Sequence, residues 1–139
     1  MMTTQKNMSA IDDFISSHNL NKPLSIDSDY FDVNYLGDQD LVKVMIKMFI
    51  NNTPSLIAEI RDSYEKENWK QLYQSVHKVK PTFTMIGLQK VSVICEYIES
   101  HVKNEHNSND IELLNDFIVL LENKAEESLE LGKKFLEAN

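Results

Sequence analysis

The chain has 139 residues, of which 42% are hydrophobic and 26% charged, a composition typical of one soluble globular domain. Its formal net charge of -8 argues against nucleic-acid binding, and no run of about 18 apolar residues is present to span a membrane. With three Gly, three Pro and one Cys, the chain has too few turn residues for an all-β barrel and cannot form an intramolecular disulfide. The N-terminus lacks an apolar signal core, so we expect a protein of the reducing cytoplasm.

Residues 1–27 are polar and weakly patterned, and we expect them to form a partly flexible N-terminal arm. A short helix is expected within this arm, over residues 9–18, followed by a linker. The arm either lies against the rest of the chain or stays mobile. Residues 28–139 are expected to form the folded domain, which begins with another short helix that ends at Gly37, because glycine is a common residue after a helix.

From residue 38 onward, apolar residues recur at intervals of three and four, the period of an amphipathic helix. The first stripe predicts a helix whose buried face consists of Leu41, Val44, Met45, Met48 and Phe49. Thr53-Pro54 then predicts a new helix start, because threonine caps helix N-termini and proline is favoured in the first turn. That helix is expected to bury Leu56, Ile57, Ile60 and Tyr64.

Three more apolar stripes follow, separated by a break at Glu67-Asn68, by Gly87 and by the polar segment 103–110. They consist of Trp69, Leu72, Val76, Val79, Phe83 and Ile86; of Val91, Ile94, Cys95, Ile98 and Val102; and of Ile111, Leu114, Ile118, Leu121, Ala125 and Phe135. No strand pattern competes with them. We therefore expect an all-α fold, an up-down four-helix bundle with one or two short additional N-terminal helices.

His77 is the histidine with the most distinctive surroundings. It lies roughly 130° around the helix from the apolar seam of residues 69–86, so its imidazole is expected to face solvent. Residues 66–103 contain three acids and six lysines, net +3, in an otherwise acidic chain. The residues expected on the same surface as His77 are Tyr73, Lys80, Pro81 and Thr84. A lone exposed histidine is most often incidental, and these observations leave that interpretation open.

The other histidines and Cys95 do not suggest a catalytic or metal site. His101 and His106 are five residues apart, a poor spacing for two ligands on one helical face. Cys95 falls on an apolar stripe, so it is expected in the core and not in a nucleophilic pair with histidine. No glycine-rich phosphate loop is present. We therefore expect neither a metal site nor an enzyme active site.

The segment around His77 resembles the signature of the histidine phosphotransfer (Hpt) family. The motif reads Val76-His77-Lys78-Val79-Lys80, with Gly87 ten residues after the histidine and with Cys95 and Ile98-Glu99 at the matching positions of the next helix. The upstream segment YLGDQDLVKVMIKMFINNTPSLIAEI resembles the first bundle helices of the family, and the resemblance covers about residues 30–135.

Pro81 departs from this pattern, because the family usually has glycine there. Proline has no backbone N–H, so the carbonyl of His77 loses its helical donor, and we expect a bend in the helix beneath the histidine. A proline in this place also resembles a motif of standalone family members. Because the sequence begins at Met and contains no other recognisable domain, we expect a standalone carrier rather than a fragment of a kinase.

The resemblance implies a phosphorelay intermediate with no turnover of its own. His77 would accept a phosphoryl group on Nε2 from a receiver-domain aspartate and pass it to another receiver. Lys80 and Lys78 would support the phosphate, and Glu99 would orient the ring through Nδ1, unless it is a solvated surface glutamate. The implied docking surface consists of Tyr73, Gln74, Pro81, Thr84 and Met85.

The implied partners are response-regulator receiver domains and a hybrid histidine kinase. Magnesium is expected on the receiver, and no cofactor is expected on this chain, which we expect to be a monomer. The alternative function is a phosphorylation-independent helical module that binds a receiver domain or another partner. In one form of this alternative Pro81 prevents phosphoryl transfer and the chain only binds a receiver. In the other form His77 has no role in the function.

Overall fold

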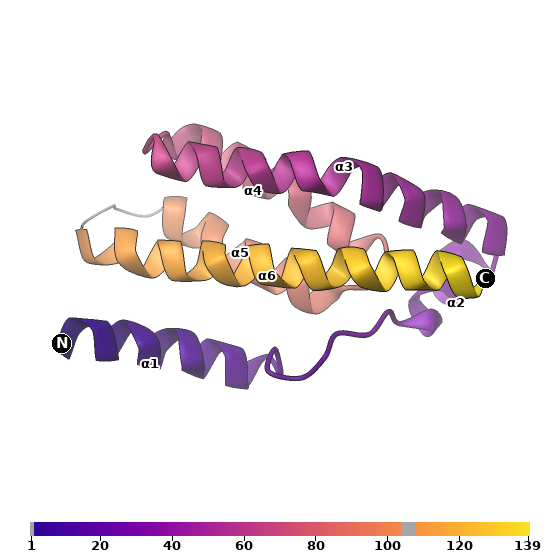
Figure 1. Ribbon diagram of the computed structural model, residues 1–139, viewed down its shortest axis with the longest axis horizontal. Helices are drawn as coiled ribbons and strands as arrows, with labels where there is room; N and C mark the ends of the chain where they lie inside the picture. Colours follow the sequence, from indigo (N-terminus) through magenta and orange to yellow (C-terminus); the bar gives the residue numbers. More distant parts are fainter. Residues whose placement is uncertain (1, 104–107) are drawn as a thin grey trace.

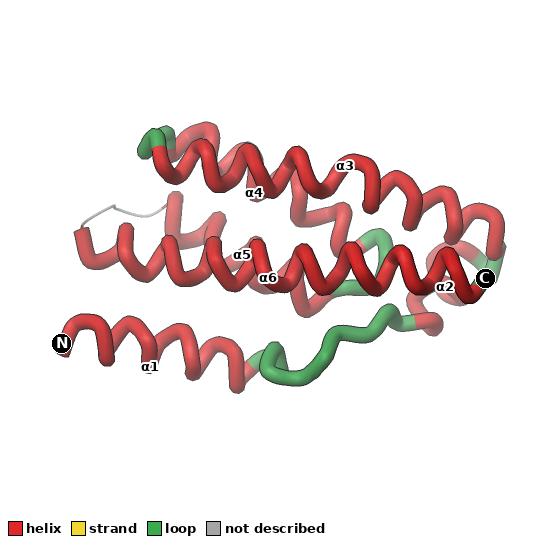
Figure 2. The backbone as a smooth tube through the Cα atoms, in the orientation of Figure 1, coloured by secondary structure: helices red, strands yellow, loops and turns green. Residues whose placement is uncertain are grey.

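The computed structural model describes residues 2–103 and 108–139, and their secondary structure is entirely α-helical. The helices are α1 (Met2–Ser17), α2 (Ser28–Tyr35), α3 (Gln39–Glu65), α4 (Trp69–Thr84), α5 (Gln89–Lys103) and α6 (Ser108–Ala138). The four long helices from α3 to α6 run in alternating directions along one axis, with α2 at one end and α1 alongside (Figure 1, Figure 2). Helices α3 and α5 each pack against both α4 and α6. The prediction of an all-α helical bundle is confirmed.

Short polar side chains begin the helices at the predicted breaks. Asp38 accepts hydrogen bonds from two backbone N–H groups of the first turn of α3, and Asn68 accepts one from the first turn of α4. Before Asn68, Glu67 adopts a left-handed conformation with φ of 53°, which turns the chain back from α3 into α4. Helix α2 ends where Leu36 and Gly37 are both left-handed, as the glycine signal indicated.

The predicted helix start at Thr53-Pro54 is wrong. Helix α3 continues through both residues, and Pro54 lies inside it. The Thr53 hydroxyl is buried without a hydrogen-bond partner among the described residues, so it caps no helix. A proline inside a helix removes one backbone hydrogen bond, but α3 packs against both α4 and α6, and tertiary packing supplies most of the stability of a helix in a protein.

The predicted buried face of α3 is also largely wrong. The helix buries Val42, Ile46, Phe49 and Ile60, whereas Leu41, Val44 and Met48 are 40%, 51% and 48% exposed. Residues 41–50 are apolar on nearly every side of the helix, so periodicity alone does not choose the buried face. Contacts choose it instead, since the side chain of Ile46, which the pattern did not select, lies close to Gly132 of α6.

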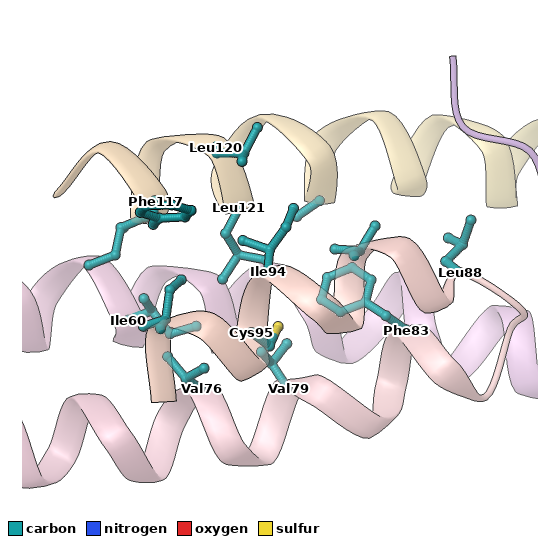
Figure 3. Close-up of a cluster of buried hydrophobic side chains, with 14 of the residues drawn as sticks. Ile60, Val76, Val79, Phe83, Leu88, Ile94, Cys95, Phe117, Leu120 and Leu121 are labelled. Atoms are coloured by element: carbon teal, nitrogen blue, oxygen red, sulfur yellow. The ribbon is translucent and has the colours of Figure 1, made fainter. Parts of the chain in front are cut away.

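The core lies between the four long helices and follows the other predicted stripes (Figure 3). Every predicted apolar residue of α4 from Leu72 onward is buried, and so is the whole α5 stripe. Helix α6 contributes Leu114, Ile118, Leu121 and Ala125, and it adds Phe117. The predicted residues that are only half-buried are Met45, Leu56, Ile57, Tyr64, Trp69, Ile111 and Phe135. Cys95 is fully buried, as expected, and burial strongly raises the pKa of its thiol.

The N-terminal arm contains a longer helix than predicted, since α1 begins at Met2. Its described part lies against α6, where the Phe14 ring packs edge-on to Phe117 with 4.8 Å between centroids. Leu20 and Leu24 of the following linker are buried. The backbone N–H of Leu24 donates a 2.5 Å hydrogen bond to the carboxylate of Glu127 on α6. The proposed domain boundary after residue 27 stays a prediction.

Candidate functional site

His77 lies on the outer surface of α4. Val76 and Val79 on the same helix are fully buried, and the imidazole between them points the other way, with 63% of its side chain exposed. This is the direction that the apolar seam of α4 indicated. The ring is therefore accessible to another protein.

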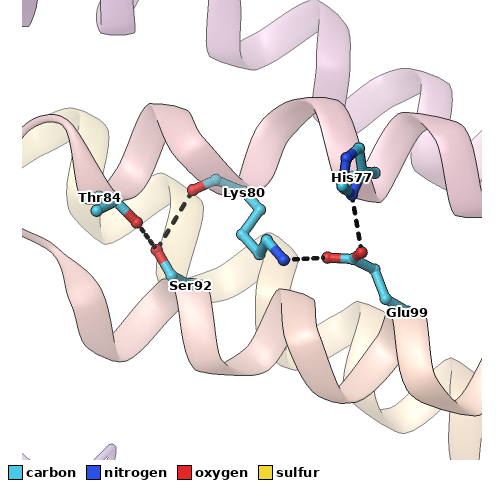
Figure 4. Close-up of polar contacts among 5 residues, drawn as sticks. All are labelled: His77, Lys80, Thr84, Ser92 and Glu99. Carbon is cyan, nitrogen blue, oxygen red and sulfur yellow. Dashed lines mark hydrogen bonds and ion pairs between the residues drawn. The ribbon is translucent and has the colours of Figure 1, made fainter.

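The imidazole is held from beneath by Glu99 of α5. The Nδ1 atom of His77 lies 2.9 Å from a Glu99 carboxylate oxygen, and that carboxylate is only 10% exposed (Figure 4). Glu99 is thus buried and not a solvated surface residue. Because a carboxylate can only accept a hydrogen bond, Nδ1 must carry the proton. The neutral tautomer that fits this contact leaves the lone pair on Nε2, the ring nitrogen remote from Glu99.

The same carboxylate also pairs with Lys80. The Nζ atom of Lys80 lies 3.0 Å from the second oxygen of Glu99. This contact with Glu99 is the main reason why the pKa of Lys80 lies above its usual 10.5, and partial burial opposes the rise. Glu99 therefore bridges two residues that are one helical turn apart on α4, and it fixes the ammonium group close to the imidazole.

Tyr73 stacks parallel to the imidazole of His77. It lies one turn before His77 on α4, and the two rings are stacked with 5.9 Å between centroids and only 7° between planes. Tyr73 itself is half-buried. The ring of His77 is thus restrained both by a hydrogen bond and by a parallel aromatic neighbour.

The remaining predicted site residues fall into two groups. Gln74, Lys78 and Pro81 are exposed around His77. Thr84 and Met85 are half-buried and engaged, since the Thr84 hydroxyl lies 2.7 Å from that of Ser92 and the Met85 carbonyl accepts a 2.6 Å hydrogen bond from Tyr35. Ser92 also donates a hydrogen bond to the backbone carbonyl of Lys80 (Figure 4).

The sequence prediction missed Ser92 and Tyr35. Ser92 lies seven residues before Glu99, which is two turns along the same side of α5. A search for polar residues on that side of the helix would have found it. No local signal points to Tyr35, because its partner is 50 residues away in the chain.

The family model of the Hpt domain matches residues 44–130, which is more than half of the chain. The chain belongs to the Hpt domain family. The matched segment contains His77, Lys80 and Glu99, together with nearly all of the four long helices. No curated protein and no solved structure matches the chain significantly.

Membership of the Hpt family carries a general function. Hpt domains transfer phosphoryl groups through a histidine in phosphorelays, and they are phosphocarriers rather than enzymes. Their partners are the receiver domains and kinases of two-component systems. The recognition of the family from the sequence is thereby confirmed.

Pro81 does not interrupt the helix of this Hpt domain. Helix α4 continues past it to Thr84, and the carbonyl of Pro81 accepts a 2.9 Å hydrogen bond from the N–H of Met85. Because the ring of Pro81 is exposed, it occupies the surface beside His77 without entering the core. The predicted bend beneath His77 stays a prediction.

Within residues 2–103 and 108–139 of the Hpt chain, no group of three or more His, Cys, Asp or Glu side chains is placed to hold a metal ion. His101 stacks on Tyr97 with 5.4 Å between centroids. His106, the other member of the spaced pair, lies outside the described residues. In the same described ranges, no helix is long and apolar enough to cross a bilayer.

Proposed function

We propose that this Hpt chain is a phosphorelay intermediate in which His77 carries the phosphoryl group between two receiver domains. The observation that supports this most strongly is the exposed imidazole whose Nδ1 is occupied by the buried carboxylate of Glu99. The nitrogen that remains for reaction, Nε2, is the one that a docked partner can approach.

The transfer step follows from this arrangement. The lone pair of Nε2 attacks the phosphorus of an aspartyl phosphate on the receiver, an N–P bond forms, and the P–O bond to the aspartate breaks. The aspartate leaves as a carboxylate. The Nδ1 proton stays between the ring and Glu99, so the phosphorylated ring is an imidazolium whose positive charge the Glu99 carboxylate offsets.

Two lysines support the phosphoryl group in this proposal. Lys80 is held near the imidazole by its ion pair with Glu99, and Lys78 is exposed beside it. Their positive charge attracts the phosphoryl oxygens, although a surface contact of this kind contributes on the order of 1 kcal/mol or less. The magnesium ion that receiver phosphorylation requires belongs to the receiver in this proposal, as does most of the transition-state stabilisation.

Phosphate transfer between purified proteins tests the proposal. The probes are the receiver domains encoded in the source genome, each phosphorylated with radiolabelled acetyl phosphate in the presence of magnesium. At least one of them should pass its label to the wild-type chain, and none of them should label His77→Gln. The label should be labile in acid and stable in base, as expected for phosphohistidine.

The alternative function makes a different prediction in the same experiment. A binding-only module would associate with a receiver in a pull-down or a titration, but no label would reach the chain. If label arrives equally on wild type and on His77→Gln, the phosphoryl group is carried by another residue and the proposed role of His77 is wrong.

A further inference from the structure

A groove lies on the surface beside His77, between the first turns of α4 and the last turn of α5. It encloses about 490 Å³ and is mainly apolar. Its lining residues are Trp69, Lys70, Tyr73, Gln74, Val102 and Lys103. Val102 is buried, Trp69 and Tyr73 are half-buried, and the two lysines and Gln74 are exposed around them. The groove therefore combines aromatic and aliphatic surface with a positively charged rim.

The groove falls within reach of any protein that docks over His77. Trp69 lies eight residues before His77, which is about 12 Å along a helix. A standard interface covers about 800 Å² on each partner, equivalent to a disc of about 16 Å radius. Tyr73 is also shared, because its ring both lines the groove and stacks on the imidazole.

On the opposite side of His77, polar groups of α4 already have hydrogen-bond partners within the chain. There, Thr84 is hydrogen-bonded to Ser92, and the carbonyl of Met85 is bonded to Tyr35. In Figure 4 the Thr84–Ser92 pair joins α4 and α5 on one side of Lys80, and the His77–Glu99 pair joins them on the other side. A projecting side chain of a partner thus finds its receiving surface on the Trp69 side.

Charge indicates what kind of partner surface fits. The chain has a net charge of -8, yet residues 66–103 hold six lysines against three acids. Lys70 and Lys103 place two of these lysines on the rim of the groove, and Lys78 and Lys80 lie nearer to His77. A receiver that holds a magnesium ion beside its aspartate presents carboxylates around that aspartate, so the charges are complementary.

We propose that this groove receives an apolar side chain, flanked by carboxylates, from the receiver domain that exchanges phosphate with His77. The inference rests on the proposed function and adds a direction to it: docking extends from His77 toward Trp69 and the end of α5. Contacts in the groove select among receivers, because a partner must supply both an apolar side chain and negative charge.

Charge reversal on the two ends of α5 tests this direction. Lys103→Glu reverses a charge on the rim of the groove. Lys90→Glu makes the same change at an exposed position near the other end of α5, before Glu99 in the sequence. The probe is the receiver domain that binds or transfers best among those of the source genome. Lys103→Glu should slow transfer and weaken binding at least about fivefold at low salt, with a smaller deficit at high salt, while Lys90→Glu stays near wild type.

A groove-filling variant and a direct probe make the test independent of charge. Gln74→Trp places a large side chain over the groove and should weaken binding. Trp69 is the sole tryptophan of the chain, so its indole N–H gives a single resonance in a ¹⁵N-labelled sample. That resonance should shift when the unlabelled receiver is added. Phosphorylation of each variant by phosphoramidate measures the reactivity of His77 without a docked protein.

The outcomes separate the two proposals. If label reaches His77 at the wild-type rate in Lys103→Glu and Gln74→Trp, and the Trp69 resonance does not move, the groove inference is overturned and the proposed function stands. If the receiver binds and shifts the Trp69 resonance but transfers no label, the groove is a docking site for a receiver, and the proposed function falls. If no receiver of the genome binds or transfers label, both are overturned.

Discussion

At the scale of single residues, the site depends on one buried carboxylate. Glu99 is 8% exposed and contacts both the imidazole of His77 and the ammonium group of Lys80. Burying a carboxylate is unfavourable unless it is paired and hydrogen-bonded, and these two partners provide that compensation. In return, Glu99 sets which nitrogen of His77 carries the proton.

Replacing Glu99 by glutamine tests this role. The amide can donate a hydrogen bond to Nδ1, which favours the tautomer with its proton on Nε2, and that nitrogen then has no lone pair for attack. A hydrogen bond to a charged group contributes about 1.5–3 kcal/mol, and we take the lower end because the ring is 63% exposed. Phosphorylation by phosphoramidate should therefore slow about tenfold, and ¹⁵N NMR of the imidazole should show the changed tautomer.

The matched control is Glu96→Gln, the same chemical change at an exposed position on α5. It should leave both the rate and the tautomer near those of the wild type. Equal behaviour of the two variants would contradict the positioning role of Glu99. Thermal unfolding of both variants separates loss of reactivity from loss of fold.

The sequence predicted part of this site for clear physical reasons. The outward direction of His77 follows from helix geometry alone, because α4 has one continuous apolar seam. The burial of Glu99 does not follow in the same way, since it lies roughly 85° from the centre of the α5 stripe, at the boundary between core and solvent. Its burial is decided by α4, which passes over that boundary.

At the scale of secondary-structure elements, α3 is the helix in which tertiary packing overrides what the local sequence pattern predicts. A threonine-proline pair predicts a helix start, but α3 continues through it and packs against both α4 and α6. Two overlapping apolar stripes compete on residues 41–50, and the long-range contacts of α3 decide which one is buried. Such contacts are invisible to a pattern that spans ten residues.

Truncations on α3 test the observed orientation. Ile46 is fully buried, so Ile46→Ala should lower the free energy of unfolding by about 2–5 kcal/mol. Met48 is 48% exposed, so Met48→Ala should change it by no more than about 0.5 kcal/mol. Urea denaturation measures both. A larger loss of stability in Met48→Ala than in Ile46→Ala would support the buried face that the sequence pattern predicted and contradict the observed one.

At the scale of the whole molecule, the N-terminal arm is joined to the bundle by contacts that the sequence did not reveal. Phe14, Leu20 and Leu24 pack onto the bundle, and the Leu24 N–H bonds to Glu127. The bundle itself was predictable because three of its helices carry uninterrupted apolar stripes. The arm has no such stripe, and its placement depends on contacts with α6, about 100 residues away.

Acid should release the contact between the arm and the bundle. Burial raises the pKa of Glu127, but the hydrogen bond from Leu24 and the contact with Lys124 together outweigh it, so the pKa lies below its usual 4.5. A lowered pKa means that the contact stabilises the folded state above pH 4.5 and is lost as the pH falls through the lower, folded-state value. The Leu24 amide resonance should therefore move with a midpoint below pH 4.5.

Glu127→Gln is the control for this titration. It removes the carboxyl group while keeping a similar shape, so the acid-dependent movement of the Leu24 resonance should disappear. A midpoint at or above pH 4.5 in the wild type would mean that Leu24 and Lys124 do not stabilise the charged carboxylate.

The enclosure of Cys95 has a practical consequence for work on this protein. A thiol that is out of reach of solvent and has a raised pKa reacts slowly with alkylating agents and oxidants. Because Cys95 is the sole cysteine and is buried, we expect the native protein to react little with maleimides. A cysteine introduced at the exposed Ser100, next to Glu99, can then take a single fluorophore, which would report the arrival of a partner in real time on an otherwise native chain.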